Sequence, residues 1–199
     1  MDQLAIIILA AGSSSRLGQP KQLLPYKDSN LLQHIITEAL KGLPNVYVVL
    51  GSNQEIIKDK LNQLPVAFVF NEDWETGMSS SIRCGISQAL IHNPLLQAVI
   101  LMVTDQPFVS SSLIADMLNK YQQSRSPIIA CTYKETVGVP VLFDRQFFSS
   151  LLRLKGQTGA KKIVEQHIEQ TQTIPFPMGY VDIDTPDDYN TFKKMKSSN

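Results

Sequence analysis

The sequence predicts an α/β protein with a mostly parallel sheet covered by helices on both faces. Apolar runs of strand length, rich in valine and isoleucine, recur along the chain and mostly lack the alternation of a half-exposed strand. Between these runs lie segments whose apolar residues recur at helical spacing. Because strands and helices alternate in this way, we expect parallel strands joined by right-handed crossovers.

The expected strands are short and buried on both faces. Their ranges are Leu4–Ala10, Val46–Leu50, Val66–Phe70, Ala98–Val103, Ile128–Cys131 and Val137–Phe143. Ligands of such sheets bind beyond the carboxyl ends of the strands, so the segments that follow these runs are the places to search for a site.

The expected helices fill the segments between these strands. Apolar stripes at helical spacing begin at Leu31, Ile56, Ile82 and Leu113. Later in the chain, two short helices are expected near Arg145–Leu154 and Gly159–Gln170, followed by a stretch interrupted by prolines and a last helix from Pro186.

Length, charge and cysteine content limit the number of domains, the partners and the compartment that we expect. The chain has 199 residues, 43% of them hydrophobic, and a formal net charge of zero. This length fits one domain, residues 1–199. Nucleic-acid and membrane-surface binders usually carry a basic excess, so neither partner is expected. Two distant cysteines and a start without a basic leader segment indicate a protein of the cytoplasm.

The segment after the first strand, from Ala10 to about Ser29, has no helical or strand period. Long loops inside a compact domain are usually functional or disordered. Gly12 allows a tight turn, the serines that follow add exposed amides, and Arg16 and Lys21 offer charges for phosphate. The spacing does not fit a P-loop or a Rossmann glycine motif. A solvated linker is the plain alternative.

The run LAAGSSSRLGQPKQLLP, residues 9–25, resembles the signature loop of nucleotidyltransferases, L-A-A/G-G-x-S-x-R-M/L-G-x-x-K-x-L. It is most similar to the MobA-like group of molybdenum-cofactor transferases. The resemblance implies nucleotide contacts from Ala10, Ala11, Gly12, Ser13, Arg16 and Lys21. Arg16 and Lys21 would contact the phosphates. The alanine at position 11, where the guanylyl branch usually has glycine, resembles the cytidylyl branch.

The segment Asn71–Arg83 follows the third strand, and Ser79 is expected to cap the next helix. A helix start presents free amides to an anion or a base edge, although a serine-rich cap alone is the plain alternative. The pattern N-x-x-W-x-x-G-M-x-x-S again resembles the cytidylyl branch. That resemblance implies base and ribose contacts from Gly77, Met78, Ser79, Ser80 and Ser81. Asn71 would support this segment, and Trp74 fits either packing or binding.

Acidic residues follow the fourth strand and precede the last helix. Asp105 lies just beyond Val103, where Mg²⁺ bound to a triphosphate would accept a carboxylate, although it could instead cap the next helix. Asp182 and Asp184 alternate and so point to one side of an extended segment. The segments around them resemble the family's metal motifs, which implies Asp105 as one ligand. Asp184 is favoured as the second and Asp182 is next.

Two later motifs resemble the acceptor side of the same family. Thr136–Phe143 contains G-x-P-x-x-F, and Lys155–Lys162 contains G-x-x-G-A. Gln157 stands where the family usually has an acidic residue, which weakens any transfer of detailed acceptor contacts.

Together these resemblances imply a three-layer αβα, Rossmann-like nucleotidyltransferase fold with a mostly parallel mixed sheet. They imply transfer of CMP from CTP to molybdopterin with Mg²⁺ and release of pyrophosphate, with Arg16, Lys21 and Asp105 as the catalytic residues. The product would be handed over to a molybdoenzyme or its chaperone. GTP or a sugar-phosphate acceptor, a regulatory nucleotide-binding module, and a flavodoxin-like or Rossmann binding protein are the alternatives.

Overall fold

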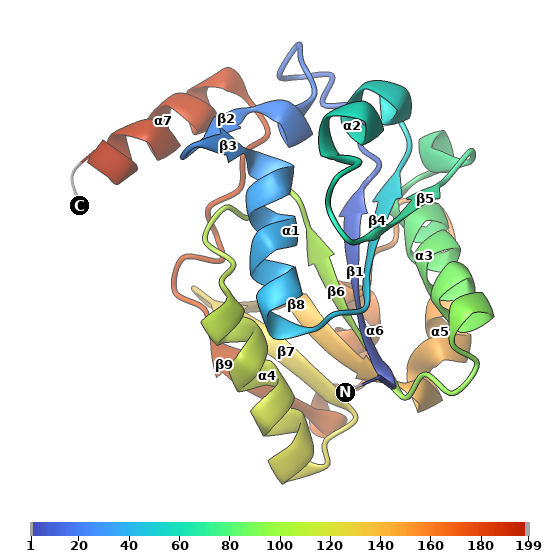
Figure 1. Cartoon of the computed structure of the whole chain (residues 1–199). Coiled ribbons are helices and arrows are strands. Elements are labelled where there is room, and N and C mark those ends of the chain that lie inside the picture. Colours follow the sequence, from blue (N-terminus) through green and yellow to red (C-terminus); the bar gives the residue numbers. More distant parts are fainter. Residues whose placement is uncertain (1, 198–199) are drawn as a thin grey trace.

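The computed structural model of the protein describes residues 2–197 and contains a seven-stranded central sheet (Figure 1). Across the sheet the strands are β5 (Ala67–Phe70), β4 (Val46–Leu50), β1 (Leu4–Ala10), β6 (Ala98–Val103), β8 (Thr136–Asp144), β7 (Ile128–Tyr133) and β9 (Thr171–Pro175). The pairs β5–β4, β4–β1, β1–β6 and β7–β9 are parallel, whereas β8 is antiparallel to both of its neighbours. The predicted mostly parallel mixed sheet is confirmed.

Strand β1 shows why the apolar runs lack alternation. Ile6 and Ile8 enter the core on one face of the sheet, and Ala5 and Ile7 enter the core on the other face. All four side chains are fully buried. A strand that is covered on both faces has no side chains facing solvent, so its sequence is apolar throughout.

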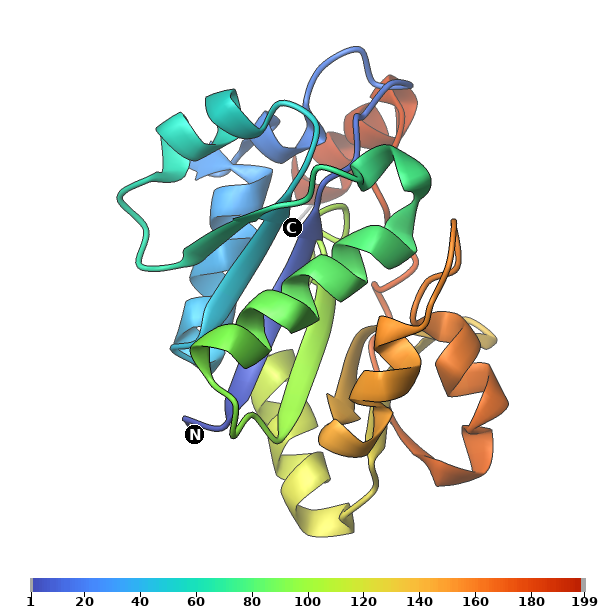
Figure 2. The ribbon, with the colours of Figure 1, turned by 90° about the vertical axis from the view of Figure 1, so that its right-hand side faces the viewer.

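Helices cover both faces of the sheet, as Figures 1 and 2 show from two directions. One face carries α1 (Leu31–Gly42), α2 (Gln54–Leu61) and α4 (Ser111–Ser124), and the other carries α3 (Met78–His92), α5 (Phe148–Leu152) and α6 (Lys161–Gln166). The predicted three-layer αβα architecture is confirmed. The last helix, α7 (Pro186–Ser197), instead lies beside the small hairpin of β2 (Pro25–Tyr26) and β3 (Ser29–Asn30).

The start of α3 differs from the sequence expectation. Ser79 was expected to cap this helix, but the cap position is Gly77 and Ser79 is the second helical residue. Gly77 has a φ of 116°, and a Cβ added there would clash with the carbonyl group of Gly156. Because another loop packs so closely here, the cap position has room only for glycine. At α4 the side chain of Ser110 caps the helix, which excludes the capping alternative for Asp105.

Strand β9 was not expected from the sequence. Its segment ends in Pro175, and the prolines here predict an interrupted stretch, yet the segment pairs in parallel with β7. It lies at the edge of the sheet, where a residue without an N–H group costs few hydrogen bonds. The proline signal was therefore compatible with an edge strand.

A small apolar cluster connects the loop after β1 to the last helix. Leu17, Leu24 and Tyr26 from the loop pack with Ile183 and with Phe192 of α7. The rings of Tyr26 and Phe192 stack with their centroids 5.5 Å apart. Helix α7 therefore holds the loop after β1 in place.

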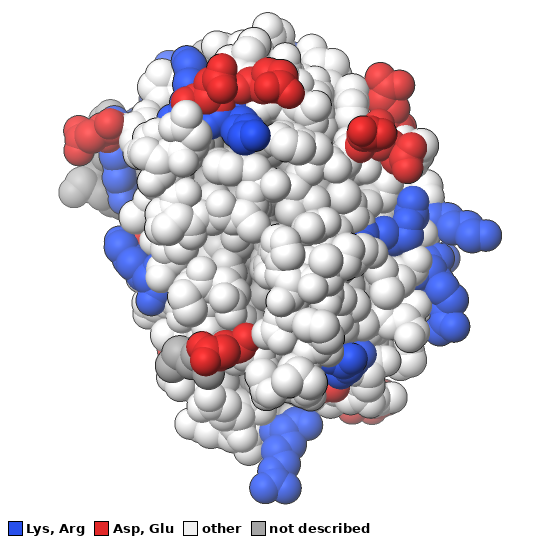
Figure 3. Space-filling view, turned by 45° about the vertical axis from the view of Figure 1, so that its right-hand side comes forward, with Lys and Arg blue, Asp and Glu red and all other residues white. Residues whose placement is uncertain are grey.

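On the face in Figure 3, charged side chains lie mainly around the margin, in some places with both signs together and in others with one sign alone, and they surround a broad uncharged area. Cys131 is buried and Cys84 is half-buried, and both are free thiols. Within residues 2–197, every helix is too short or too polar to span a bilayer.

Candidate functional site

A cavity of about 450 Å³ opens at the carboxyl ends of β1 and β6. Its lining residues are Leu9, Ala10, Ala11, Gly12, Ser13, Ser14, Ser15, Arg16, Lys21, Gln22, Trp74, Glu75, Gly77, Met78, Ser81, Val103, Thr104, Asp105, Gln157 and Asp184. Parallel strands of such a sheet direct their following loops to one edge, where ligands bind. The structure thus brings the loop after β1, the start of α3 and two of the expected acids into one cavity.

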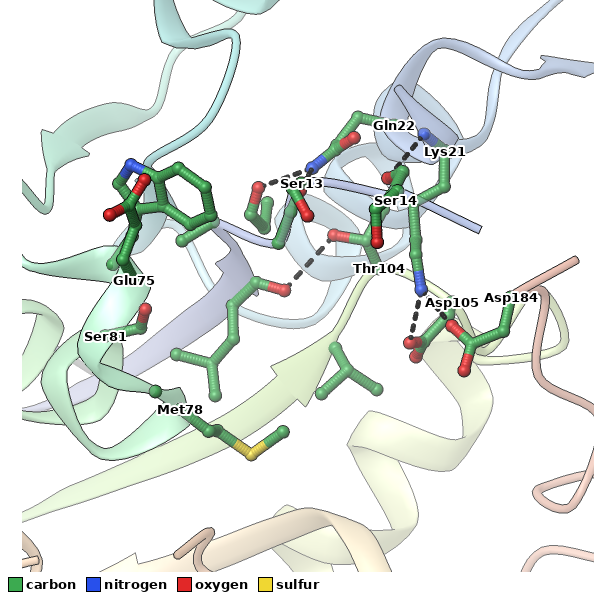
Figure 4. A pocket seen from close by; sticks show the side chains of 18 of the residues that line it. Ser13, Ser14, Lys21, Gln22, Glu75, Met78, Ser81, Thr104, Asp105 and Asp184 are labelled. Atoms are coloured by element: carbon green, nitrogen blue, oxygen red, sulfur yellow. Dashed lines mark hydrogen bonds and ion pairs between the residues drawn. The ribbon is translucent and has the colours of Figure 1, made fainter. Parts of the chain in front are cut away.

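One side of this cavity, here called the charged wall, consists of Arg16, Lys21, Asp105 and Asp184. The ammonium group of Lys21 lies 3.0 Å from Asp105 Oδ2 and also donates to Asp184 Oδ1 (Figure 4). Arg16 Nη2 donates to the other oxygen of Asp184 at 2.7 Å. Two cations and two carboxylates therefore form one connected group.

The pKa values of this group follow from its contacts. Burial alone would lower the pKa of Lys21, but Asp105 and Asp184 outweigh it and raise that pKa above its ordinary value. Burial alone would raise the pKa of Asp184, but Lys21 and Arg16 outweigh it and lower that pKa. Lys21 is therefore positively charged and Asp184 negatively charged at neutral pH.

A backbone contact places the second acid beside the first. The N–H group of Ile183 donates to the carbonyl oxygen of Asp105 at 3.1 Å, which positions Asp184 next to Asp105. Directly after it, Thr185 and Asp188 exchange hydrogen bonds across the first turn of α7. These reciprocal bonds form a capping box, so Asp188 has a structural role at the start of α7.

The alternative acid, Asp182, has a different environment. It is exposed and does not line the cavity, in contrast to Asp184. Burial of its carboxylate and the negative charge of Asp105 raise the pKa of Asp182. Asp182 therefore lies within electrostatic reach of Asp105 but outside the ion-pair group.

The loop after β1 is shaped by a buried residue that sequence reasoning missed. Gln22 is only 1% exposed, and its Nε2 donates to the carbonyl oxygens of Ala10 at 2.6 Å and Gly12 at 3.2 Å. Ser14 Oγ accepts a hydrogen bond from the backbone N–H group of Lys21 at 2.9 Å. The sequence signal for this role was the position of Gln22 directly before the apolar pair Leu23–Leu24, which predicts that its polar side chain is drawn toward the core.

The opposite side of the cavity is lined by Trp74, Glu75, Gly77, Met78 and Ser81, and the four of these that carry no formal charge are here called the uncharged wall. These residues come from the short segment before α3 and from its first turns (Figure 4). Buried Asn71 supports them, since its Nδ2 donates to Ser80 Oγ at 2.8 Å and to Ser81 Oγ at 3.0 Å. The uncharged wall presents an aromatic ring, a thioether and one hydroxyl group, and the exposed carboxylate of Glu75 lies beside them (Figure 4).

Two of the expected nucleotide contacts point elsewhere. Ser80 Oγ donates to the carbonyl oxygen of Gly77 at 2.8 Å, and Ser79 Oγ accepts from Arg83 at 3.1 Å. Both serines are buried and lie outside the cavity lining. On the acceptor side, Gln157 lines the cavity, whereas Gly138 packs against the hydroxyl group of Tyr133.

A family model described as the MobA-like NTP transferase domain matches residues 6–171. The chain belongs to this family. The predicted nucleotidyltransferase fold and the resemblance of the loop after β1 are therefore confirmed.

The relatives of this MobA-like chain are named for different activities. The nicotine blue oxidoreductase of Paenarthrobacter nicotinovorans is 30% identical over 168 residues, covering 80% of each chain. The molybdenum cofactor cytidylyltransferase of Escherichia coli (strain K12) is 26% identical over 198 residues, covering 98% of this chain and 97% of that one. A crystal structure of Rv0371C from Mycobacterium tuberculosis H37Rv, in complex with manganese, is 28% identical with a TM-score of 0.79, covering 96% of this chain and 98% of that one.

The charged wall of this MobA-like domain fits a divalent metal ion. Asp105 and Asp184 already share one cation, and Mg²⁺ prefers one or two carboxylates completed by phosphate oxygens and water. No group of three His, Cys, Asp or Glu residues within the described chain could hold a metal ion by itself. A metal ion at this pair would thus need ligands from a bound substrate.

Proposed function

We propose that the chain, as one domain of residues 1–199, transfers CMP from CTP to the phosphate of a molybdopterin-type acceptor and releases pyrophosphate. The observation that carries the proposal is the acidic pair Asp105 and Asp184, which lies in one cavity with the loop after β1. Membership of the MobA-like family supports nucleotidyl transfer in general. The full-length similarity to a molybdenum cofactor cytidylyltransferase supports this choice of substrates.

In the proposed reaction, the loop after β1 and the charged wall bind the triphosphate. Arg16 and Lys21 neutralise its oxygens, and the backbone amides of residues 12–15 contribute further donors. Asp105 and Asp184 would hold Mg²⁺, which when bound neutralises phosphate charge in the transition state. The manganese complex of a related structure supports the use of a divalent ion.

The acceptor supplies its own nucleophile. A phosphate monoester has a second pKa of about 6, so its oxyanion is present at neutral pH without a general base. An acceptor oxygen forms a bond to the α-phosphorus of CTP while the bond from that phosphorus to the bridging oxygen breaks, and pyrophosphate leaves with that oxygen. Catalysis then depends on orientation and on charge neutralisation.

The uncharged wall is proposed to hold the base and ribose. Trp74 and Met78 offer an apolar surface, and Ser81 offers a hydroxyl group. Ala11 supports CTP over GTP because the guanylyl branch usually has glycine at this position. The proposal places the reaction in the cytoplasm and includes hand-over of the product to a molybdoenzyme or its chaperone.

The decisive experiment measures pyrophosphate release. CTP and GTP are each combined with molybdopterin and with sugar phosphates, with and without Mg²⁺. We expect release with CTP, molybdopterin and Mg²⁺ together, and loss of turnover in Asp105→Ala with an unchanged melting curve. Asp187→Ala, an exposed acid outside the cavity, is the matched control. Near-normal turnover of Asp105→Ala, or no release with any pair, contradicts the proposal.

The 30% identity to the nicotine blue oxidoreductase favours a second candidate, a redox enzyme that uses the same cavity. Fold and family do not decide function by themselves. Oxidation of NADH or NADPH, followed by absorbance with an electron-accepting dye, tests this candidate. Redox turnover that persists in Asp105→Ala, without pyrophosphate release, would select it over nucleotidyl transfer.

A further inference from the structure

We propose that Lys21 occupies the cation position of the acidic pair until a triphosphate draws it away. The divalent ion and the triphosphate then bind cooperatively. The triphosphate draws Lys21 out of the metal position, and the metal ion replaces the positive charge that Lys21 supplied to the acids. This inference rests on the proposed nucleotide site, and it concerns how that site changes from its empty state to its loaded state.

The carboxylates of the pair are already engaged. Lys21 donates to Asp105 Oδ2 and Asp184 Oδ1, and Arg16 donates to Asp184 Oδ2, so three of the four carboxylate oxygens bind protein cations. Mg²⁺ binds oxygen at about 2.0–2.1 Å and demands near-octahedral geometry. An ammonium group bridging the same two carboxylates lies where such an ion would have to be. Metal binding therefore requires Lys21 to leave.

Burial and charge keep Lys21 in this position while the site is empty. Its side chain is 13% exposed, compared with 57% for Lys41, another lysine in an ion pair. Two cations and two carboxylates cancel in formal charge. A divalent ion added alone would give the group two excess positive charges, and a triphosphate alone would add a negative excess. When both ligands bind, each offsets part of the charge excess that the other would leave alone.

The two cations of the charged wall can move, whereas its two acids are held together. Lys21 carries its charge on a flexible four-carbon side chain and shares the cavity with the serine-rich loop, so torsions of that side chain can redirect its ammonium group toward a phosphate. Arg16 is 69% exposed and can also turn. The two acids stay together because the N–H group of Ile183 bonds to the carbonyl oxygen of Asp105. Departure of Lys21 would thus leave a preformed acidic pair.

Linkage makes the effect reciprocal. If triphosphate binding raises the affinity for the metal, the metal raises the affinity for triphosphate by the same factor. The empty protein would then hold divalent ions weakly although it carries a suitable acidic pair.

The test measures Mn²⁺ binding to nucleotide-free protein by electron paramagnetic resonance. We expect weak binding by the wild type and about 10-fold tighter binding by Lys21→Met, a factor within the usual range for coupled sites. Lys21→Arg keeps the charge and should bind weakly like the wild type. Equal Mn²⁺ affinity in the wild type and Lys21→Met overturns the proposal.

Three further variants locate the effect. Lys41→Met removes a lysine that pairs with Glu38 at 2.6 Å outside the cavity, and it should leave Mn²⁺ binding unchanged. Adding Asp184→Asn to Lys21→Met should abolish the gained affinity, and a gain that survives this change contradicts the assigned position. If Lys21→Met does not fold, Lys21→Gln replaces it.

Wild-type Mn²⁺ affinity must also rise with CTP present, after correction for Mn²⁺ bound to free nucleotide, and no rise overturns the proposal.

The outcome is separable from that of the proposed function. Failure of pyrophosphate release with all substrate pairs would reject the transferase assignment, but a gain of Mn²⁺ binding in Lys21→Met would still establish the exchange of cations. Conversely, normal release with equal Mn²⁺ affinities would reject only the cation exchange.

Discussion

The charged wall and the uncharged wall face the same cavity but obtain their shapes in different ways. Ion pairs between side chains distant in sequence define the charged wall, as between Arg16 and Asp184. Backbone packing defines the uncharged wall, where Gly77 lies against Gly156 and buried Asn71 supports the first turn of α3. Side-chain ion pairs can exchange partners when a charged ligand enters, whereas close backbone packing cannot. The comparison indicates a charge-responsive side and a rigid side.

The largest effect should come from the charged wall. Asp184→Asn should lower turnover by about 1,000-fold, because it removes a proposed metal ligand from the transition state. Asp182→Asn should change turnover by less than about 5-fold, since Asp182 is exposed and lies outside the cavity lining. Pyrophosphate release at saturating CTP measures both. The opposite ranking would assign the second acid to Asp182.

The next effect tests the rigidity of the uncharged wall. Gly77→Ala should destabilise the protein by about 3 kcal/mol, because a Cβ meets the carbonyl group of Gly156 and the φ of 116° disfavours a side chain. Gly156→Ala is the matched control. Its φ is 61° and a Cβ there meets no atom within 4 Å, so about 1 kcal/mol is expected. Urea unfolding measures both, and similar losses would show that the close packing contributes little.

A smaller effect is expected for ligand binding at the charged wall. Lys21→Ala should weaken CTP binding by about 10-fold, equivalent to about 1.4 kcal/mol, through loss of a charge-assisted phosphate contact. Calorimetry with CTP in buffer free of divalent ions measures the affinity, so that the metal binding gained on removal of Lys21 does not offset the loss. Unchanged affinity would mean that Lys21 does not contact phosphate.

The smallest effect concerns a contact outside both walls. Glu38 of α1 accepts from Lys41 at 2.6 Å and from the N–H group of Ser111 at 2.8 Å, which joins α1 to α4. Burial alone would raise the pKa of Glu38, but Lys41 and Ser111 outweigh it and hold that pKa at about 2. Glu38→Gln should cost about 1 kcal/mol near neutral pH and leave turnover unchanged.

The pH dependence of this contact has a defined sign. Because the folded pKa of Glu38 lies below its ordinary value of 4.5, the stabilisation is complete above that value and is lost as pH falls toward 2. Wild type and Glu38→Gln should therefore differ most in unfolding free energy near neutral pH and converge in acid. A difference that grows in acid would contradict this assignment.

The sequence predicted the sheet, the layers and the loop after β1, because buried parallel strands and a glycine-serine loop leave strong local patterns. It favoured Asp184 over Asp182 through the family resemblance alone, since alternation places both on one side of an extended segment. The choice depends on the backbone bond between Ile183 and Asp105, which joins distant parts of the chain. The cap at Gly77 likewise depends on a neighbouring loop, and β9 depends on its place at the sheet edge.

The apolar cluster of Leu17, Leu24, Tyr26, Ile183 and Phe192 has a practical consequence. Removing residues 186–199 would spare every strand of the central sheet, yet it would uncover the apolar side of the loop after β1 and release the segment that carries Asp184. Such a shortened protein should still fold into its layers while losing the arrangement of the charged wall. Purification tags and fluorescent fusions are therefore better attached to the opposite terminus.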